Sequence, residues 1–175
     1  MHIRRALAHE AEELSALTLR AKAHWGYVNA QLEAWQSSLE ISAESVSARP
    51  TFVGQLNGRI IGFYSLVPAA AEWELDNLWV APEYIRRGFG RALVAHAVET
   101  ATAGGATAIV IDSDPNAEPF YLACTAKRVG EVSAPIAGQP TRVRPQLVLA
   151  ITRSNISFES RRSASAVQLR RWAYS

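Results

Sequence analysis

The residues best suited to chemistry gather in one short run, residues 86–91, with the sequence Arg-Arg-Gly-Phe-Gly-Arg. An apolar segment with the pattern of a strand precedes this run, and a helical pattern follows it. Glycine lacks a Cβ atom, so Gly88 and Gly90 let backbone N–H groups face outward and an anion approach closely. The start of the helix adds unpaired N–H donors and the positive end of the helix dipole. The sequence therefore predicts a cradle for a phosphate group.

Two common nucleotide-binding loops do not fit this run. A nucleotide P-loop needs Gly-x-x-x-x-Gly-Lys-Ser/Thr, and the chain contains no such segment. A dinucleotide-binding fingerprint needs a third glycine three residues after Gly90, where the chain has Leu93. That fingerprint also follows the first strand of its unit, whereas this run comes after several strands with an antiparallel pattern. At this point the residues leave the phosphate ligand open.

Hydrophobic periodicity and turn residues predict the elements that position the cradle. Asn57–Gly58 is a strong hairpin signal, and Gly104–Gly105 ends the helix that begins at the cradle. The predicted strands are 2–7, 51–56, 59–67, 72–80, 108–112, 128–133 and 146–151. The predicted helices are 10–23, 29–40, 88–103 and 117–126, with a further helical turn at 42–47.

The composition is typical of a folded domain. The chain has 175 residues, of which 49% are hydrophobic and 19% charged, so we expect one globular domain with a real core. Cys124 is the only cysteine, which excludes an internal disulfide. The N-terminus lacks the apolar stretch of a signal peptide, and no segment is apolar enough to cross a bilayer. We therefore expect a cytoplasmic protein with no membrane partner.

The small net charge of +2 is unevenly distributed. Residues 153–175 contain five arginines and one glutamate, so residues 1–152 are slightly acidic. A nucleic-acid-binding domain carries a basic face in its folded body, so we expect no nucleic-acid partner. We predict a single domain at residues 1–152, followed by a weakly ordered basic tail, rich in serine and arginine, at residues 153–175.

Residues 76–93 as a whole resemble the pyrophosphate-binding motif of the GNAT superfamily of acyl-CoA-dependent N-acetyltransferases. The order of the predicted elements resembles the fold of that superfamily over residues 1–152. The resemblance implies an α/β fold, with a central, mostly antiparallel twisted sheet, one splayed parallel strand pair, and flanking helices. It also implies acetyl-CoA as the cosubstrate. No metal is expected, because no cluster of His, Cys and carboxylate residues has ligand spacing.

The resemblance also implies which residues contact acyl-CoA. They are Leu78, Trp79, Val80, Ile85, Arg86, Arg87, Gly88, Phe89, Gly90, Arg91, Ala92, Asn116 and Tyr121. Pantetheine would pair with the exposed strand backbone and with Asn116, and a bulge in the strand would leave an N–H group free to polarise the acetyl carbonyl. The family usually has Gln or Arg where this chain has Ile85. Because the cradle consists mostly of backbone N–H groups, we expect binding to survive that change.

Carboxylates on the strand before the cradle are candidates for the general base, because an acceptor amine is mostly protonated at neutral pH. By strand alternation, Glu72, Glu74, Asp76, Leu78 and Val80 should point to one face. By its position before Val80, Glu74 resembles the base of protein-acetylating members of the superfamily. Asp76 could be the base or an anchor for a cationic amine. Alternatively, Glu72 and Glu74 merely solvate one face of the strand.

Other candidate residues lie further from the cradle in sequence. The resemblance makes Tyr121 the acid that protonates the departing sulfur, and the alternative is a tyrosine buried in the core. His24, Trp25 and Tyr27 lie between the first two predicted helices, where members of the superfamily commonly wall the acceptor pocket. These three side chains could hold an apolar or cationic acceptor, or they could form a hydrophobic plug over the sheet.

The sequence thus favours an N-acetyltransferase that moves an acetyl group from acetyl-CoA to the primary amine of a small molecule. The amine would attack directly in a ternary complex. One alternative is a non-catalytic acyl-CoA-binding sensor or interaction module, and another is a protein acetyltransferase acting on lysine or an N-terminus. GNAT-like domains are often dimers, so a homodimer stays open. The identity of the acceptor depends on loop shape, which residue spacing does not reveal.

Overall fold

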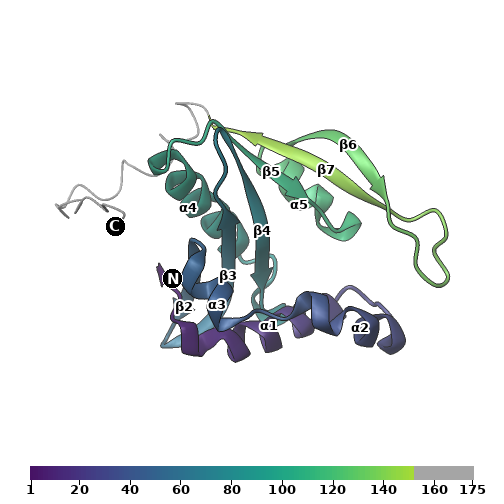
Figure 1. Ribbon diagram of the computed structural model, residues 1–175. Coiled ribbons are helices and arrows are strands. Elements are labelled where there is room, and N and C mark those ends of the chain that lie inside the picture. The colour runs from purple at the N-terminus through teal and green to yellow at the C-terminus, as the bar shows by residue number, and fades with distance from the viewer. Residues whose placement is uncertain (152–175) are drawn as a thin grey trace.

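The computed structural model describes residues 1–151, so the expected tail at 153–175 lies outside the described residues. The chain forms a seven-stranded sheet in the order β1-β2-β3-β4-β5-β7-β6, with helices on its faces (Figure 1). The strands are β1 (His2–Arg5), β2 (Thr51–Leu56), β3 (Arg59–Val67), β4 (Glu72–Val80), β5 (Ala108–Asp112), β6 (Lys127–Ser133) and β7 (Val143–Ala150). The helices are α1 (Ala11–Ala23), α2 (Asn29–Trp35), α3 (Ala43–Ala48), α4 (Phe89–Ala103) and α5 (Glu118–Ala123). The predicted mixed α/β architecture is confirmed.

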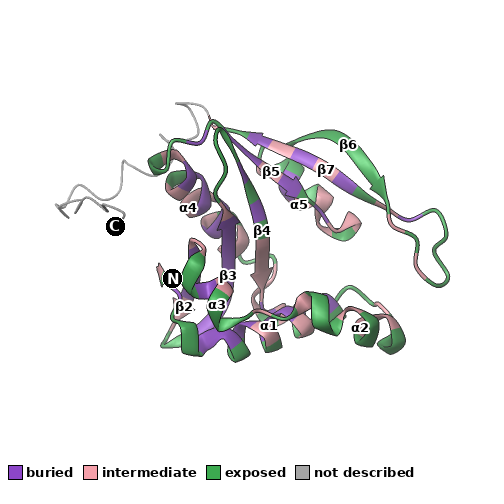
Figure 2. Cartoon of the chain, in the orientation of Figure 1, coloured by how far each residue is buried: buried purple, intermediate pink, exposed green. Residues whose placement is uncertain are grey.

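Two hydrophobic cores cover the two faces of the sheet. On one face, α4 packs its apolar stripe, which includes Leu93 and Val98, against buried side chains of β3, β4 and β5. On the other face, α1 and α3 pack against β2 and β3 through Leu14, Leu17 and Val46. Figure 2 shows the contrast between the buried centre of β3 and the exposed outer strand β6. The site therefore rests on a rigid central part of the sheet.

Local turn chemistry accounts for most element boundaries. The backbone of both Asn57 and Gly58 is left-handed, with φ of 51° and 78°, as a tight hairpin between β2 and β3 requires. The helix predicted at 29–40 is shorter: α2 ends at Trp35, and a 3₁₀ turn follows. There the Ser38 hydroxyl donates a hydrogen bond to the Trp35 carbonyl oxygen. This side-chain bond competes with the backbone hydrogen bond that a continuing α-helix would make to the same oxygen.

Two boundaries in the C-terminal half also differ from the prediction. The helix predicted at 117–126 is shortened to α5, and the left-handed backbone of Thr125, with φ of 71°, prevents its continuation. The strand predicted at 146–151 begins earlier, at Val143. Pro145 lies beyond the last residue of β7 that pairs with β5, so no ladder hydrogen bond to β5 needs its missing N–H group.

The parallel pair of β4 and β5 is short. The two strands pair only where residues 72–74 face residues 108–110, and the other pairs of neighbouring strands are antiparallel. Beyond Glu74 the strands diverge, which is visible in Figure 1 as an open wedge. The predicted splayed parallel pair is therefore present. It leaves the second half of β4 without a partner strand on its β5 side.

A β-bulge lies at Asp76, within β4. Ser65 pairs with Asn77, but the next residue of β3, Leu66, pairs with Leu75, so Asp76 has no opposite partner. Such an insertion shifts the side-chain alternation of the strand by one residue. Carboxylates before the bulge and apolar residues after it therefore no longer follow one common alternation between the two faces of the sheet.

This bulge makes the prediction of one shared face wrong. Trp73 belongs to the core under α4, so Glu74, its neighbour in the strand, points to the opposite face. Leu78 and Val80, beyond the bulge, also pack against the α4 core. Glu74 therefore does not share a face with Leu78 and Val80. Alternation fails here because the bulge adds one residue to β4 that β3 does not match.

The end of α4 gives a stability prediction. A Cβ atom added at Gly104 would lie 2.2 Å from Cζ2 of the buried Trp73 ring. We expect Gly104→Ala to lower the free energy of unfolding by about 1–3 kcal/mol through overpacking, measured by chemical denaturation. The matched control is Gly130→Ala in β6, where the nearest atom, Cβ of Gln146, is 3.9 Å away. Equal denaturation midpoints for the two variants would contradict the assigned packing.

Candidate active site

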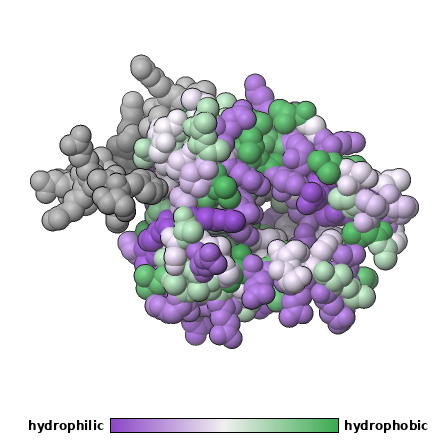
Figure 3. Space-filling view, in the orientation of Figure 1, coloured by the Kyte–Doolittle hydropathy of each residue, from purple (hydrophilic) through white to green (hydrophobic). Residues whose placement is uncertain are grey.

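A cavity of about 540 Å³ opens where β4 and β5 separate. Its walls come from β4, the loop before α4 with the first turn of that helix, the segment from β5 to α5, and the end of α1. Figure 3 shows this face of the molecule hollowed between the helices α1 and α2 and the strands at the far edge of the sheet. Segments distant in the sequence thus meet around one cleft.

The strand wall contains four of the residues predicted for the site. Asp76, Leu78, Trp79 and Val80 all line the cavity. The β5-facing edge of β4 has no strand partner over these residues, so an extended ligand can pair with its backbone groups. Glu74 is exposed and does not line the cavity, because β4 is still paired with β5 at this residue, before the two strands separate.

The predicted cradle lies at the start of α4. Arg86 and Gly88 have left-handed backbone, with φ of 62° and 85°, and no side chain caps the helix that begins at Phe89. The first-turn N–H groups of α4 therefore lack intrahelical partners and carry the positive end of the helix dipole. Three further predicted cradle residues line the same cavity: Ile85, Gly90 and Arg91. This arrangement suits a phosphate group.

The two glycines of the cradle have different structural roles. A Cβ atom at Gly88 would have no atom within 4 Å, so open space lies above this left-handed residue. A Cβ atom at Gly90 would lie 3.2 Å from the Phe120 ring. Gly90 thus lets α5 pack closely against the first turn of α4. The sequence pattern indicated the first role and missed the second.

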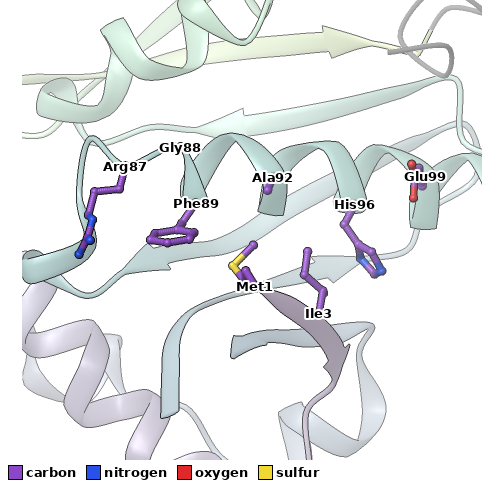
Figure 4. Close-up of a pocket in the computed structure, with 8 residues that line it drawn as sticks. All are labelled: Met1, Ile3, Arg87, Gly88, Phe89, Ala92, His96 and Glu99. Carbon is purple, nitrogen blue, oxygen red and sulfur yellow. The ribbon is translucent and has the colours of Figure 1, made fainter. Parts of the chain in front are cut away.

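Three predicted cradle residues do not line this cavity. Arg87, Phe89 and Ala92 border a second cavity of about 390 Å³, between α4 and the N-terminal strand (Figure 4). Gly88 borders both cavities, so the start of α4 separates them. The guanidinium of Arg87 lies 5.5 Å from the centre of the Tyr84 ring, a cation–π contact.

Tyr121 lines the cavity from α5 and is buried. Burial raises the pKa of its hydroxyl well above the ordinary value, so the group stays protonated at neutral pH. Its hydroxyl makes no hydrogen bond to any residue among 1–151. Burial also raises the pKa of the nearby Cys124 thiol, which favours its protonated form. Tyr121 is the group in this wall that can donate a proton to a ligand.

Asp76 presents one free carboxylate oxygen. Its Oδ2 accepts hydrogen bonds from Arg49 (2.7 Å), Ser65 (3.2 Å) and Asn77 (2.8 Å). Its Oδ1 accepts none from the residues that the structure describes. The indole N–H of Trp79 donates to Asn77 Oδ1 at 2.9 Å and so fixes the amide. A carboxylate held by one oxygen leaves the other available for a cationic group in the cavity.

The structure separates the three aromatic residues predicted for the acceptor pocket. Trp25 lines the cavity, with 38% of its surface exposed. His24 is exposed and packs edge-on against Trp25 without lining the cavity. Tyr27 also lies outside the lining, and its hydroxyl donates to the Asp114 carboxylate at 2.9 Å. Asn116, for which a contact with acyl-CoA is predicted, lines the cavity beside Asp114.

A buried charged cluster at this wall was not predicted from the sequence, and one of its members, Asp114, also lines the cavity. Asp114 accepts hydrogen bonds from Lys22 and Arg142, and each of these three residues is largely buried. Burial would raise the pKa of Asp114, but the bonds from Lys22, the Asn116 backbone and Tyr27 hold this pKa below its usual value. One signal was available: Lys22 follows Thr18 by four positions, on the buried stripe of α1.

Two negative findings bear on other kinds of site. Among residues 1–151, no group of three or more His, Cys, Asp or Glu side chains is arranged to hold a metal ion. No helix of the same described part is long and apolar enough to cross a membrane.

The sequence of the chain matches a known protein family. Residues 11–125 match the acetyltransferase (GNAT) family. A curated relative, the uncharacterized N-acetyltransferase YafP of Escherichia coli strain K12, is 28% identical over 109 residues, which cover 62% of this chain and 65% of the relative. The chain therefore spans slightly less than two thirds of that relative's length.

Solved structures share the fold. A GCN5-related N-acetyltransferase of Rhodopseudomonas palustris superposes with a TM-score of 0.71 at 22% identity, covering 85% of this chain and 94% of that chain. PaiA N-acetyltransferase of Thermoplasma acidophilum, solved with coenzyme A, gives a TM-score of 0.70 at 17% identity, covering 85% and 98%. Because the family match covers most of the described residues, this chain belongs to the GNAT family of acetyltransferases.

Proposed function

We propose that this protein transfers an acetyl group from acetyl-CoA to the primary amine of a small molecule. The observation that carries the proposal is a single cavity that combines an uncapped helix start, an unpaired strand edge, a protonated tyrosine and a carboxylate with one free oxygen. The coenzyme A complex of the Thermoplasma protein with the same fold supports the choice of cosubstrate. Because the reaction needs acetyl-CoA, a cytoplasmic location is part of the proposal.

The residues fit acetyl-CoA from one end of the cavity to the other. The first turn of α4, with Arg86 and Arg91, would hold the pyrophosphate. The unpaired edge of β4 would pair with the pantetheine arm, and Asn116 would bond it from the opposite wall. The thioester would then lie between the bulge of β4 and Tyr121.

The proposed chemistry is a direct attack in a ternary complex. The neutral amine nitrogen attacks the thioester carbonyl carbon, the carbon–sulfur bond breaks, and the sulfur takes a proton from Tyr121. The proton lost by the amine goes to Asp76 or to water. Backbone N–H groups of β4 near the bulge would stabilise the negative charge that develops on the carbonyl oxygen.

Two features favour a small cationic acceptor. Asp76 Oδ1 accepts no hydrogen bond from the described residues and can bind an ammonium group. The tryptophans that line the cavity, Trp25 and Trp79, can face a cation.

The cradle assignment predicts the effect of a bulky residue at Gly88. A tryptophan there would project into the open space above the first turn of α4 and occupy the proposed pyrophosphate position. We expect Gly88→Trp to abolish coenzyme A binding in isothermal titration calorimetry. The matched control is Gly58→Trp, another left-handed glycine with open space, located in the β2–β3 hairpin. Normal binding by Gly88→Trp would overturn the cradle assignment.

Loss of the Tyr121 hydroxyl should affect chemistry more than binding. We expect Tyr121→Phe to lower turnover more than about tenfold, within the range of general acid catalysis, with nearly unchanged coenzyme A affinity. The control is Tyr64→Phe, which removes another buried hydroxyl outside the cavity. Release of free coenzyme A from acetyl-CoA is the assay, with a panel of amines as acceptors. Unchanged turnover in Tyr121→Phe would remove this residue from the mechanism.

Substitution of the two candidate carboxylates, Asp76 and Glu74, should affect kcat/KM for the acceptor differently. Asp76→Asn keeps the size of the side chain but removes its charge, so we expect kcat/KM for the acceptor to fall about tenfold or more. Coenzyme A affinity should stay unchanged. Glu74→Gln should leave kcat/KM unaltered, because Glu74 is exposed outside the cavity. A loss in Glu74→Gln without a loss in Asp76→Asn would reverse the assignment.

A further inference from the structure

A largely buried polar cluster at the cavity wall joins three distant parts of the chain, and its central residue, Asp114, lines the cavity. We call Lys22, Tyr27, Asp114 and Arg142 the Asp114 cluster. Lys22 lies in the last turn of α1, and Tyr27 follows in the connection to α2. Asp114 follows β5, and Arg142 precedes β7 in the β6–β7 hairpin. All of the other three side chains donate to the Asp114 carboxylate. The cluster thus cross-links segments that the sheet does not hold together.

Charge and packing make the cluster rigid. Two cations share one carboxylate, and both also lie over aromatic faces: Lys22 Nζ is 4.9 Å from the Tyr27 ring centre and 4.6 Å from that of Trp35. The Arg142 guanidinium lies 5.7 Å and 5.5 Å from the same two rings. Breaking a buried charge pair leaves an uncompensated charge, so these side chains have few alternative positions.

The cluster fixes the orientation of Asn116. The Nδ2 group of Asn116 donates to Asp114 Oδ1 at 3.1 Å and to the Tyr27 hydroxyl at 3.2 Å, and the Asn116 backbone N–H donates to Asp114 Oδ1 at 2.9 Å. Both contacts of the side-chain amide use the nitrogen. The amide oxygen has no hydrogen bond to a described residue, and Asn116 lines the cavity. The cluster therefore leaves the acceptor atom of Asn116 free.

We propose that Tyr27 and Asp114 are positioning residues for the cosubstrate, which hold the Asn116 amide so that its oxygen accepts a hydrogen bond from an amide N–H of the pantetheine arm. This inference rests on the proposed function, since it requires acyl-CoA in the cavity. It assigns Tyr27 to the cosubstrate side, whereas the sequence places Tyr27 in the acceptor pocket. The reason is geometric: the Tyr27 hydroxyl contacts Asp114 and Asn116, and Tyr27 does not line the cavity.

The test uses Tyr27→Phe in the full chain, because this change removes one oxygen and keeps the ring against Lys22, Arg142 and Trp35. We expect the Kd for coenzyme A to rise about two- to tenfold, the effect of one lost hydrogen bond. The Kd for ADP, which carries a pyrophosphate without the pantetheine arm, should stay unchanged. The acceptor KM should also stay unchanged, and kcat should change less than about twofold.

A double-mutant cycle separates positioning from a general structural role. If Tyr27 acts through Asn116, then Tyr27→Phe should not weaken coenzyme A binding further in an Asn116→Ala background. The matched control is Tyr64→Phe, since Tyr64 also donates or accepts two buried hydrogen bonds, to His96 (2.7 Å) and Thr100 (2.8 Å), but lies outside the cavity. That variant should bind coenzyme A normally.

The outcomes distinguish this inference from the proposed function. Unchanged coenzyme A affinity in Tyr27→Phe, equal weakening of ADP, or an undiminished effect in the Asn116→Ala background would each overturn the positioning role while leaving acetyl transfer intact. A raised acceptor KM with normal coenzyme A binding would return Tyr27 to the acceptor pocket. Failure of the wild-type chain to bind coenzyme A would overturn the proposed function and the inference together.

Discussion

The structure of the site depends on one constraint, the early separation of β4 and β5 after residues 72–74. Backbone N–H and C=O groups need hydrogen-bond partners, and within residues 1–151 the second half of β4 has no strand partner on its β5 side. An extended ligand with amide groups can supply those partners. The same separation makes room for the first turn of α4 at one end of the cleft and for α5 on the opposite wall. The fold therefore creates the binding surface by leaving a sheet incomplete.

The bulge at Asp76 is the second determinant of the site. It shifts the side-chain alternation of β4 by one residue, so Leu78 and Val80 beyond it pack against the α4 core. The Asp76 carboxylate lies in the cavity lining. Three donors then bind one oxygen of that carboxylate and leave the other free. Trp73 and Leu75 both belong to the α4 core, so Glu74 and Asp76, which alternate with them, lie on the same opposite face. The two carboxylates differ because β4 is still paired with β5 at Glu74 and is no longer paired with it at Asp76.

Local patterns in the sequence predicted much of the fold and the cradle. Asn57–Gly58 defined a hairpin, and Gly88 and Gly90 marked the start of α4, because backbone conformation at these positions depends on the residue itself. The bulge depends on the pairing register between β3 and β4, which residue types along one strand do not specify. The bonds of Asp114 depend on three segments brought together only by the complete fold. The chemical roles of the cavity residues remain predictions.

The contact between Tyr27 and Asn116 has a thermodynamic consequence. Trp25, in the lining of the cavity, lies two residues before Tyr27, so the same short connection borders both proposed ligands. If binding of one ligand orders this connection, the other ligand binds to a chain that is already ordered. Such linkage is reciprocal: the factor by which acetyl-CoA strengthens acceptor binding equals the factor by which the acceptor strengthens acetyl-CoA binding. The connection between α1 and α2 as a whole, rather than the Tyr27 hydroxyl itself, would then carry a coupling free energy between the two substrates.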